Sequence, residues 1–304
     1  MMKRFFRATL LIIVAILFLL GAGWYGYTHR PAPESIHQVL FEGVTYTRDV
    51  RSEPRPLVIH VIAVDLSAPE VEFLVTPGDP DRNQPLLARK TSRFLDEFGL
   101  QVAVNGDFFT PWHSNSPIDY EPHAGDPVDV WGFASSRGVI YSQAEKTGAT
   151  LYISEDNRPS FHEPIGEVFN AISGNPMILE EGEVAIDLQA HAYHSTLHPR
   201  TVVALDADAT RLIILLVDGR QPNYSEGVTM AELAGILREY GAYSALNLDG
   251  GGSTTLAIEG ESGEPVLLNS PIDNRIPGRE RPVANHLGIF AHRIDSAAEN
   301  RAGD

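Results

Sequence analysis

Short runs of β-branched and aliphatic residues, each closed by turn residues, limit most strongly what this chain can fold into. Runs this short are typical of strands and shorter than most helices. Hydrophobic residues make up 43% of the sequence, which supplies a sizeable core and excludes intrinsic disorder. The chain is therefore predicted to be rich in β-structure. The runs are LVIHVIAVDL (57–66), VEFLV (71–75), LQVAV (100–104), TVVAL (201–205) and RLIILLV (211–217).

Two helices are predicted between these strands. The first covers 86–98 and ends at Gly99. The second covers 229–240, where Thr229 and Glu232 have the spacing of a capping box. Its apolar residues recur at the spacing of one helix face, which indicates packing against a core.

The second helix links the strand that ends at Val217 to a strand over 242–248, and each strand is followed by Asp and Gly. A strand–helix–strand unit of this kind predicts two parallel strands, adjacent or one apart. Their ends, and therefore Asp218 and Asp249, would then meet at one edge of the sheet, where ligands of α/β sheets bind. The strand before Asn105 follows the same logic. We expect these three strand ends to converge.

The predicted fold class is α+β or mixed α/β. We expect a single β-rich domain over 38–294, with a mixed sheet flanked by a few helices. Residues 28–37 are polar, contain two prolines and are interpreted as a tether. No second linker or repeat divides the rest of the chain.

The amino end predicts export. Residues 8–29 carry no formal charge and are long enough for a helix that crosses a bilayer. Three basic residues precede this run and Arg30 follows it, which keeps the amino end in the cytoplasm. Residues 1–30 are thus an anchor that leaves the domain on the exported face, periplasmic or extracellular. If instead they form a cleaved signal, the protein is secreted.

Charge and missing motifs exclude several classes of function. The formal net charge is −17, and all 40 acidic residues follow residue 30. No nucleic-acid partner is expected for so acidic a body, the membrane partner is reached through the amino-terminal helix only, and an anionic ligand needs a few placed arginines. The sequence has no Cys, which excludes disulfides, thiolate metal sites and a Cys nucleophile. It also lacks a Gly-x-Ser-x-Gly elbow and a phosphate loop with Lys.

The sharpest motif is Asp249-Gly-Gly-Gly-Ser-Thr-Thr-Leu, in which three glycines allow close approach of the backbone to a ligand. It resembles the signature of the phosphodiester glycosidase domain family, which includes the lysosomal uncovering enzyme. Five further segments resemble that family in the same order along the chain. They are VNGDFF (104–109), GNPMILEEGE (174–183), HPRTVVAL (198–205), VDGRQPNYSEGVTMAELAGIL (217–237) and ERPVANHLGIF (280–290).

Two departures from the family pattern leave the substrate open. Asp107 stands where the family usually has a second Gly. The segment 111–133 is longer than the usual connection, and its acidic residues and histidines form a lid, a metal site or a polar surface loop. These residues are His113, Asp119, His123, Asp126 and Asp129.

The resemblance implies an exported hydrolase that cleaves the bond between a sugar's anomeric carbon and a phosphodiester oxygen, in envelope or exopolysaccharide material. Such chemistry needs a carboxylate for the oxocarbenium-like centre and cations for the phosphate. The candidate catalytic residues are Asp249, Asp218 and His286. The candidate substrate-binding residues are Asn105, Asp107, Arg200, Thr201, Arg220, Gly250, Gly251, Gly252, Ser253, Thr254 and Arg281.

Two alternatives stay open at this point. One is a metal-dependent phosphodiesterase that uses Asp107, Asp218 and Asp249 as ligands. The other is a non-catalytic module that binds envelope glycans. The expected partner is a sugar phosphate or polysaccharide; no cofactor is expected, and a divalent cation is not excluded.

Overall fold

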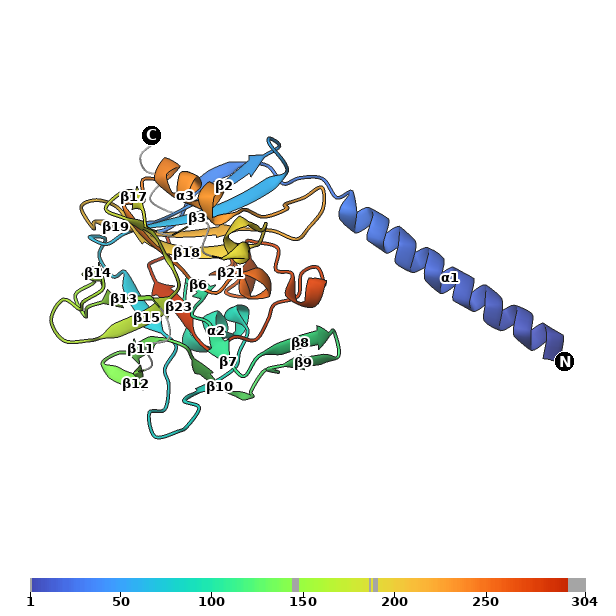
Figure 1. The fold of residues 1–304 in the computed structure, drawn as a ribbon, viewed down its shortest axis with the longest axis horizontal. Helices are drawn as coiled ribbons and strands as arrows, with labels where there is room; N and C mark the ends of the chain where they lie inside the picture. Colours follow the sequence, from blue (N-terminus) through green and yellow to red (C-terminus); the bar gives the residue numbers. More distant parts are fainter. Residues whose placement is uncertain (1, 144–147, 186, 188–190, 295–304) are drawn as a thin grey trace.

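The computed structural model describes residues 2–143, 148–185, 187 and 191–294 (Figure 1). Strands dominate this part of the chain, and the predicted β-rich fold with a few helices is confirmed. The helices are α1 (Met2–Thr28), α2 (Thr91–Phe98) and α3 (Met230–Glu239), with short 3₁₀ turns η1 (Ala192–Ser195), η2 (Gly251–Ser253) and η3 (Asp273–Arg275).

The largest sheet of the described residues joins strands from both ends of the domain. β18 lies between β19 and β20 and runs antiparallel to both, so β19 and β20 run in the same direction. Because α3 connects these two strands, the predicted crossover is present with one strand between its members. The order is β1 (Ile36–Phe41), β2 (Val44–Arg51), β3 (Leu57–Asp65), β19 (Arg211–Val217), β18 (Arg200–Leu205), β20 (Ser244–Asn247), β16 (Met177–Glu180) and β17 (Glu183–Val184).

A second sheet holds the strand that precedes Asn105. Its order is β22 (Pro265–Leu267), β21 (Leu256–Glu259), β6 (Val102–Asn105), β23 (His286–Phe290) and β4 (Glu72–Val75). The end of β6 therefore reaches the site from a different sheet than the ends of β19 and β20, which the sequence pattern alone does not reveal.

The remaining described strands form a third sheet and two small ones, and they contribute side chains to the same core as the first two sheets. The third sheet has the order β12 (Val139–Gln143), β11 (Phe133–Ser136), β15 (Asn170–Gly174), β13 (Ala149–Ile153) and β14 (Pro159–Phe161). The small sheets are β5 (Leu86–Leu87), β10 (Pro127–Val130) and β7 (Phe109–Thr110), and the hairpin β8 (His113–Ser116) with β9 (Asp119–Glu121).

The core is layered, and alternation along the strands explains the layers. In β19, Ile213 and Leu215 pack toward α3, whereas Ile214 and Leu216 belong to the cluster shared with the second sheet. The far face of the second sheet packs on α2 through Phe94. Figure 1 accordingly shows α3 and α2 on opposite sides of the stacked sheets. Two apolar faces per strand require the near-continuous hydrophobic runs seen in the sequence.

The two domain helices differ in how well the sequence predicts them. The capping box of α3 is present, because Thr229 and Glu232 bond each other's backbone N–H groups. The predicted helix over 86–98 is wrong in its first part: Leu86–Leu87 pairs with β10, and Arg89 pairs with Val283. Sheet pairing there outweighs the helical apolar spacing, and α2 begins only at Thr91.

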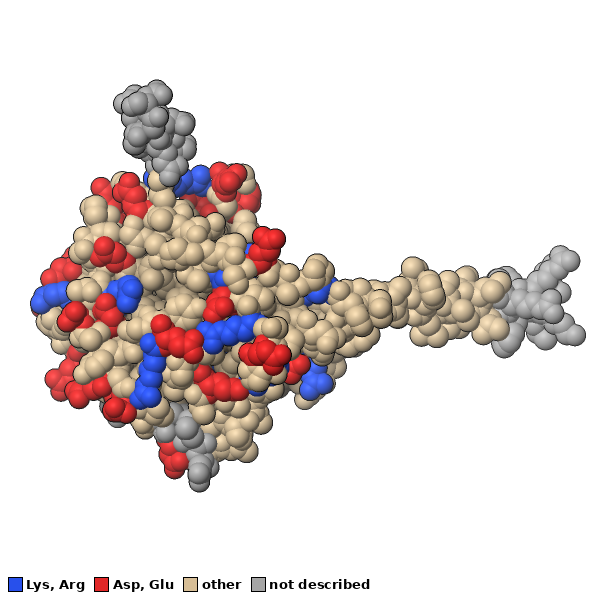
Figure 2. All heavy atoms as spheres, turned by 90° about the horizontal axis from the view of Figure 1, so that it is seen from above, with Lys and Arg blue, Asp and Glu red and all other residues tan. Residues whose placement is uncertain are grey.

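The amino-terminal helix is long and apolar enough to cross a membrane, with a candidate span over Thr9–Thr28. The apolar residues of that span are exposed, and burial begins only at its end, where Thr28 is buried. Figure 2 shows its described part projecting as a rod without acidic side chains from a domain with many. The end of the helix, however, contacts the domain: Tyr27 Oη donates to Gln221 Oε1 at 2.8 Å. The predicted tether, 28–37, also contacts the domain, because Asn223 Nδ2 donates to Thr28 O at 3.1 Å, and β1 already begins at Ile36.

We expect a chain that begins at Trp24 to be soluble and to unfold cooperatively, because the apolar part of α1 packs on nothing. A chain that begins at Pro31 also loses the contacts of Tyr27 and Arg30. Its melting temperature should be about 2–4 °C lower, which corresponds to a loss of about 1 kcal/mol in the free energy of unfolding for a domain of this size. Thermal unfolding followed by circular dichroism measures both. Aggregation of the first chain would show that α1 belongs to the folded core.

Candidate active site

One cavity collects the glycine-rich turn, several arginines and an aromatic wall. It has a volume of about 470 Å³. Its lining comes from segments far apart in sequence, which meet where β20 and β6 end. The lining residues are Phe108, Phe109, Thr110, Trp112, Ser114, Trp131, Tyr193, Arg220, Asp249, Gly250, Gly251, Gly252, Asn274, Arg275 and Arg281.

Asp249 is held in the cavity wall by its backbone. Its N–H donates to Gly106 O at 2.9 Å, and its carbonyl accepts from Asn105 Nδ2 at 2.6 Å. Its carboxylate accepts a hydrogen bond from Ser253 Oγ at 2.6 Å. Burial raises the pKa of this carboxyl, while Arg281, Ser253 and the backbone of Gly250 act in the opposite direction. Of the described residues that line the cavity, Asp249 is the acidic one.

The three glycines after Asp249 allow arginines to lie against the backbone. A Cβ on Gly251, which has φ +63°, would lie 2.9 Å from Arg220 Nη2. A Cβ on Gly252 would overlap the guanidinium of Arg281. The glycines are therefore required for close approach of cations to the turn, in addition to any ligand.

Three arginines converge on the cavity in spite of the acidic composition. Arg281 Nε pairs with Asp273 Oδ1 at 2.8 Å, and its Nη1 donates to Ser253 Oγ at 3.1 Å. Arg220 and Arg275 form no ion pair with a carboxylate of the described residues, so their charge is available to a ligand. The sequence analysis selected Arg220 and Arg281 but missed Arg275, which has no motif around it.

Strained backbone presents two of these arginines. Arg220 has φ +59°, and the consecutive residues Asn274 and Arg275 have φ +51° and +59°. Non-glycine residues in the left-handed region cost about 1–3 kcal/mol each and concentrate at functional sites. Arg220 also donates to His198 Nδ1 at 3.0 Å, and burial together with Arg220 lowers the pKa of His198 to about 4, so this imidazole is neutral near pH 7.

An aromatic wall lies in the same cavity, and Asp107 organises part of it. Asp107 accepts N–H bonds from Phe108 at 2.7 Å and from Gly132 at 2.8 Å. These bonds join two segments whose rings, Phe108 and Trp131, stack with centroids 5.7 Å apart. Burial raises the pKa of Asp107 well above its ordinary value. Asp107 therefore lies behind the wall, and sequence reasoning missed the aromatic residues because no local pattern marks them.

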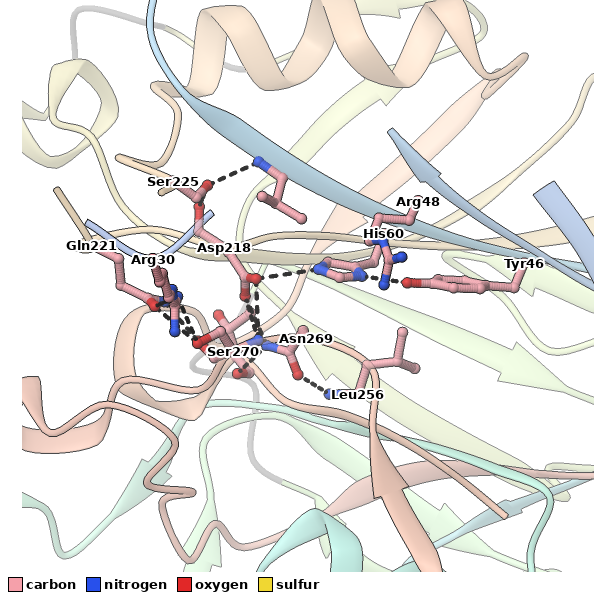
Figure 3. A network of polar contacts seen from close by, with 12 residues as sticks. Arg30, Tyr46, Arg48, His60, Asp218, Gln221, Ser225, Leu256, Asn269 and Ser270 are labelled. Atoms are coloured by element: carbon pink, nitrogen blue, oxygen red, sulfur yellow. Dashed lines mark hydrogen bonds and ion pairs between the residues drawn. The ribbon is translucent and has the colours of Figure 1, made fainter. Parts of the chain in front are cut away.

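Asp218 lies in a buried network behind the cavity, and it does not line the cavity (Figure 3). Its carboxylate accepts from Asn269 Nδ2 at 3.1 Å and from Ser270 N at 3.0 Å, and lies 3.2 Å from His60 Nε2. Its backbone carbonyl accepts from Ser225 Oγ at 2.6 Å. The shared sheet edge is as predicted, but these contacts give Asp218 the surroundings of a structural carboxylate.

Other predicted residues also lie outside the cavity lining. Arg200 is fully buried and donates to three backbone carbonyls, including Tyr193 O at 3.2 Å, and so supports η1, which carries Tyr193. Thr201 donates to Asn105 Oδ1 at 2.9 Å. Thr254 is buried beside the glycine turn. His286 is buried against Phe94, 3.0 Å from Thr76 Oγ1, and burial lowers its pKa to about 3.

In the described part of the chain, the residues proposed as metal ligands do not form a metal-binding cluster. Among the described residues, no three His, Asp or Glu side chains form a cluster that could hold a metal ion, and this includes the three aspartates named above. In the 111–133 segment, His113 lies 3.3 Å from both Asp119 and Glu121 on the exposed β8–β9 hairpin. His123 pairs with Asp126.

We expect Asp218→Asn to lower the free energy of unfolding by about 2–4 kcal/mol, because an amide places an NH₂ group against donors that are already buried. Urea denaturation of the chain that begins at Trp24 measures this. The matched control is Asp249→Asn, which faces the cavity and should change stability by less than about 1 kcal/mol. Equal losses would contradict the different roles of the two carboxylates.

Comparison with known proteins places this cavity in a family. A family model described as phosphodiester glycosidase matches residues 98–290. The chain is 26% identical over 194 residues to mouse N-acetylglucosamine-1-phosphodiester alpha-N-acetylglucosaminidase, covering 58% of this chain and 34% of that protein. It is 36% identical over 92 residues to an uncharacterized SPbeta prophage-derived protein of Bacillus subtilis, covering 30% and 13%. The chain thus spans about a third or less of these relatives.

A solved structure shows the same fold. The catalytic domain of zebrafish N-acetylglucosamine-1-phosphodiester alpha-N-acetylglucosaminidase superposes with a TM-score of 0.60 at 21% identity, covering 87% of this chain and 86% of that one. The sequence resemblance over ordered segments is thereby confirmed. Because the family match extends over more than half of its residues, this chain belongs to the phosphodiester glycosidase family.

Proposed function

We propose that the protein hydrolyses the bond between the anomeric carbon of a sugar and the oxygen of a phosphodiester. The observation that carries the proposal is the joint placement of Asp249, Arg220, Arg275 and Arg281 in one cavity with aromatic rings. Aromatic faces suit the apolar face of a sugar ring, and guanidinium groups suit a phosphate. Family membership supports the same reaction class.

The reaction needs charge stabilisation at two points. Water forms a bond to the anomeric carbon and the bond from that carbon to the phosphate oxygen breaks, which leaves a free sugar and a phosphate monoester. Positive charge develops on the sugar, where the carboxylate of Asp249 stabilises it or attacks the carbon. Negative charge develops on the leaving phosphate, where the three arginines stabilise it. A phosphate leaves readily, so a second carboxylate as general acid is less necessary.

In this proposal, several residues of the predicted site position other residues and do not contact the substrate themselves. Ser253 bridges Asp249 and Arg281, since its hydroxyl donates to the carboxylate and accepts from the guanidinium. Asn105 and Asp107 position the turn and the aromatic wall. We assign Asp218, Arg200, Thr201 and His286 to the support of the fold and the loops, on the basis of their burial and contacts.

The location is part of the proposal. The helix over Thr9–Thr28 has the length and composition of an anchor, and the basic residues before it favour an exported domain. An exported hydrolase of this kind would act on sugar phosphates of the cell envelope or of exopolysaccharides.

Asp249→Asn should reduce kcat by at least about a hundredfold, because a neutral amide neither attacks nor stabilises the oxocarbenium-like centre. Release of free sugar from activated sugar 1-phosphodiesters measures it. If this variant keeps its activity while remaining folded, Asp249 is not the catalytic carboxylate.

The pH dependence of kcat should report the ionisation of Asp249, because only the carboxylate stabilises positive charge. Burial raises its pKa, so activity is lost on acidification at a higher pH than for an ordinary aspartate. Arg281 lowers this pKa, so Arg281→Gln should move the acidic limb to still higher pH, while Arg281→Lys keeps it near the wild-type position. An acidic limb that does not move in Arg281→Gln would exclude Asp249 as the titrating group.

A further inference from the structure

A second cavity adjoins the first and shares two of its arginines. It has a volume of about 630 Å³, and both Arg220 and Arg275 line it as well as the first cavity. Unlike the first cavity, it contains residues of the amino-terminal helix. These residues are Trp24 and Tyr27, and Gln221 lines the same cavity. A group bound by the two arginines would therefore have the first cavity on one side and the end of α1 on the other.

The end of α1 is fixed against the loop that carries Arg220. Tyr27 donates to Gln221, and Asn223 Nδ2 donates to Thr28 O at 3.1 Å. The guanidinium of Arg30 lies 3.4 Å from the ring centroid of Tyr224 and donates to Ser270 Oγ at 3.2 Å, beside the network of Asp218 (Figure 3). These contacts hold the second cavity at the point where the apolar helix leaves the domain.

That point lies at a membrane surface if α1 spans a bilayer. Trp24 and Tyr27 lie at the end of the apolar run, in the position that aromatic residues take at the membrane–water interface. Figure 1 also shows the β8–β9 hairpin on the side of the domain from which α1 projects. Ile118 at the tip of this hairpin is 92% exposed, so an apolar side chain is accessible on that side of the domain.

We propose that the alcohol esterified to the sugar phosphate is a membrane lipid, with the sugar in the first cavity, the phosphodiester at Arg220 and Arg275, and the start of the lipid chain in the second cavity. This inference rests on the proposed hydrolase function and names its substrate class. Water adds to the anomeric carbon and the bond to the phosphate oxygen breaks, so the free sugar leaves and a lipid phosphate monoester stays in the membrane.

The test uses the full chain in phosphatidylcholine vesicles with matched substrates. Each pair joins one sugar 1-phosphate to methanol or to hexadecanol, for several common hexoses and N-acetylhexosamines. We expect kcat/KM for the hexadecyl diester to exceed that for the methyl diester by about tenfold or more. Release of free sugar measures both.

A pair of variants separates the second cavity from simple enrichment of the substrate in the vesicle. Trp24→Ala removes one of the two aromatic side chains that α1 contributes to the second cavity and should lower the hexadecyl-to-methyl ratio of kcat/KM by about tenfold. Leu17→Ala removes an exposed apolar side chain from the same helix, far from the cavity, and should leave the ratio unchanged.

The outcomes distinguish this inference from the function on which it rests. If both diesters are hydrolysed with similar kcat/KM, or if Trp24→Ala and Leu17→Ala behave alike, the lipid subsite is wrong and the hydrolase function stands. If no pair is hydrolysed, the proposed function fails and the lipid subsite fails with it.

Discussion

The side chain of Asn105 ties together the parts on which the site depends. Its Nδ2 donates to Asp249 O, and its Oδ1 accepts from Thr201 Oγ1 at 2.9 Å and Thr255 N at 3.1 Å. Thr201 belongs to the largest sheet and Asn105 to the second, so one buried amide connects both sheets with the glycine turn. An amide offers a donor and an acceptor on one rigid plane, which an acid or an apolar residue cannot replace. The position of Asp249 relative to both sheets follows from these bonds.

The part of the site that is local in sequence could be predicted from the sequence. Asp249 and its three glycines form one segment after an apolar strand, and the crossover through α3 fixes the edge on which Asp249 lies. The same crossover also predicts Asp218 at that edge, and the structure confirms this position. It could not decide whether the side chain faces solvent or core, because His60 and Asn269, which surround Asp218, come from distant segments.

The remaining site residues depend on tertiary contacts that no local pattern encodes. Trp112 and Trp131 reach the cavity from a segment that reads as a polar loop, and Asp107 accepts an N–H bond from Gly132 near the end of that segment. Arg275 lines the cavity from a left-handed backbone conformation that its sequence does not predict. Arg200, in contrast, has the sequence surroundings of a phosphate ligand, yet it is fully buried and its Nε and Nη2 donate to backbone carbonyls. Charge and neighbours in sequence do not determine what an arginine binds.

The loop after β19 links the buried network, the site and the end of α1. Asp218 and Ser225 hold its two ends together, since Ser225 Oγ donates to Asp218 O and accepts from Val58 N. Between them, Arg220 contributes to the cavity and the next residue, Gln221, accepts a hydrogen bond from Tyr27 of α1. The side chain of Arg220 therefore lines the cavity, whereas that of Gln221 contacts α1. The left-handed backbone at Arg220 allows these two neighbouring side chains to point in different directions. Tyr27 of α1 is thus hydrogen-bonded to the residue next to Arg220, so a single peptide unit separates the contact with α1 from a cation of the cavity.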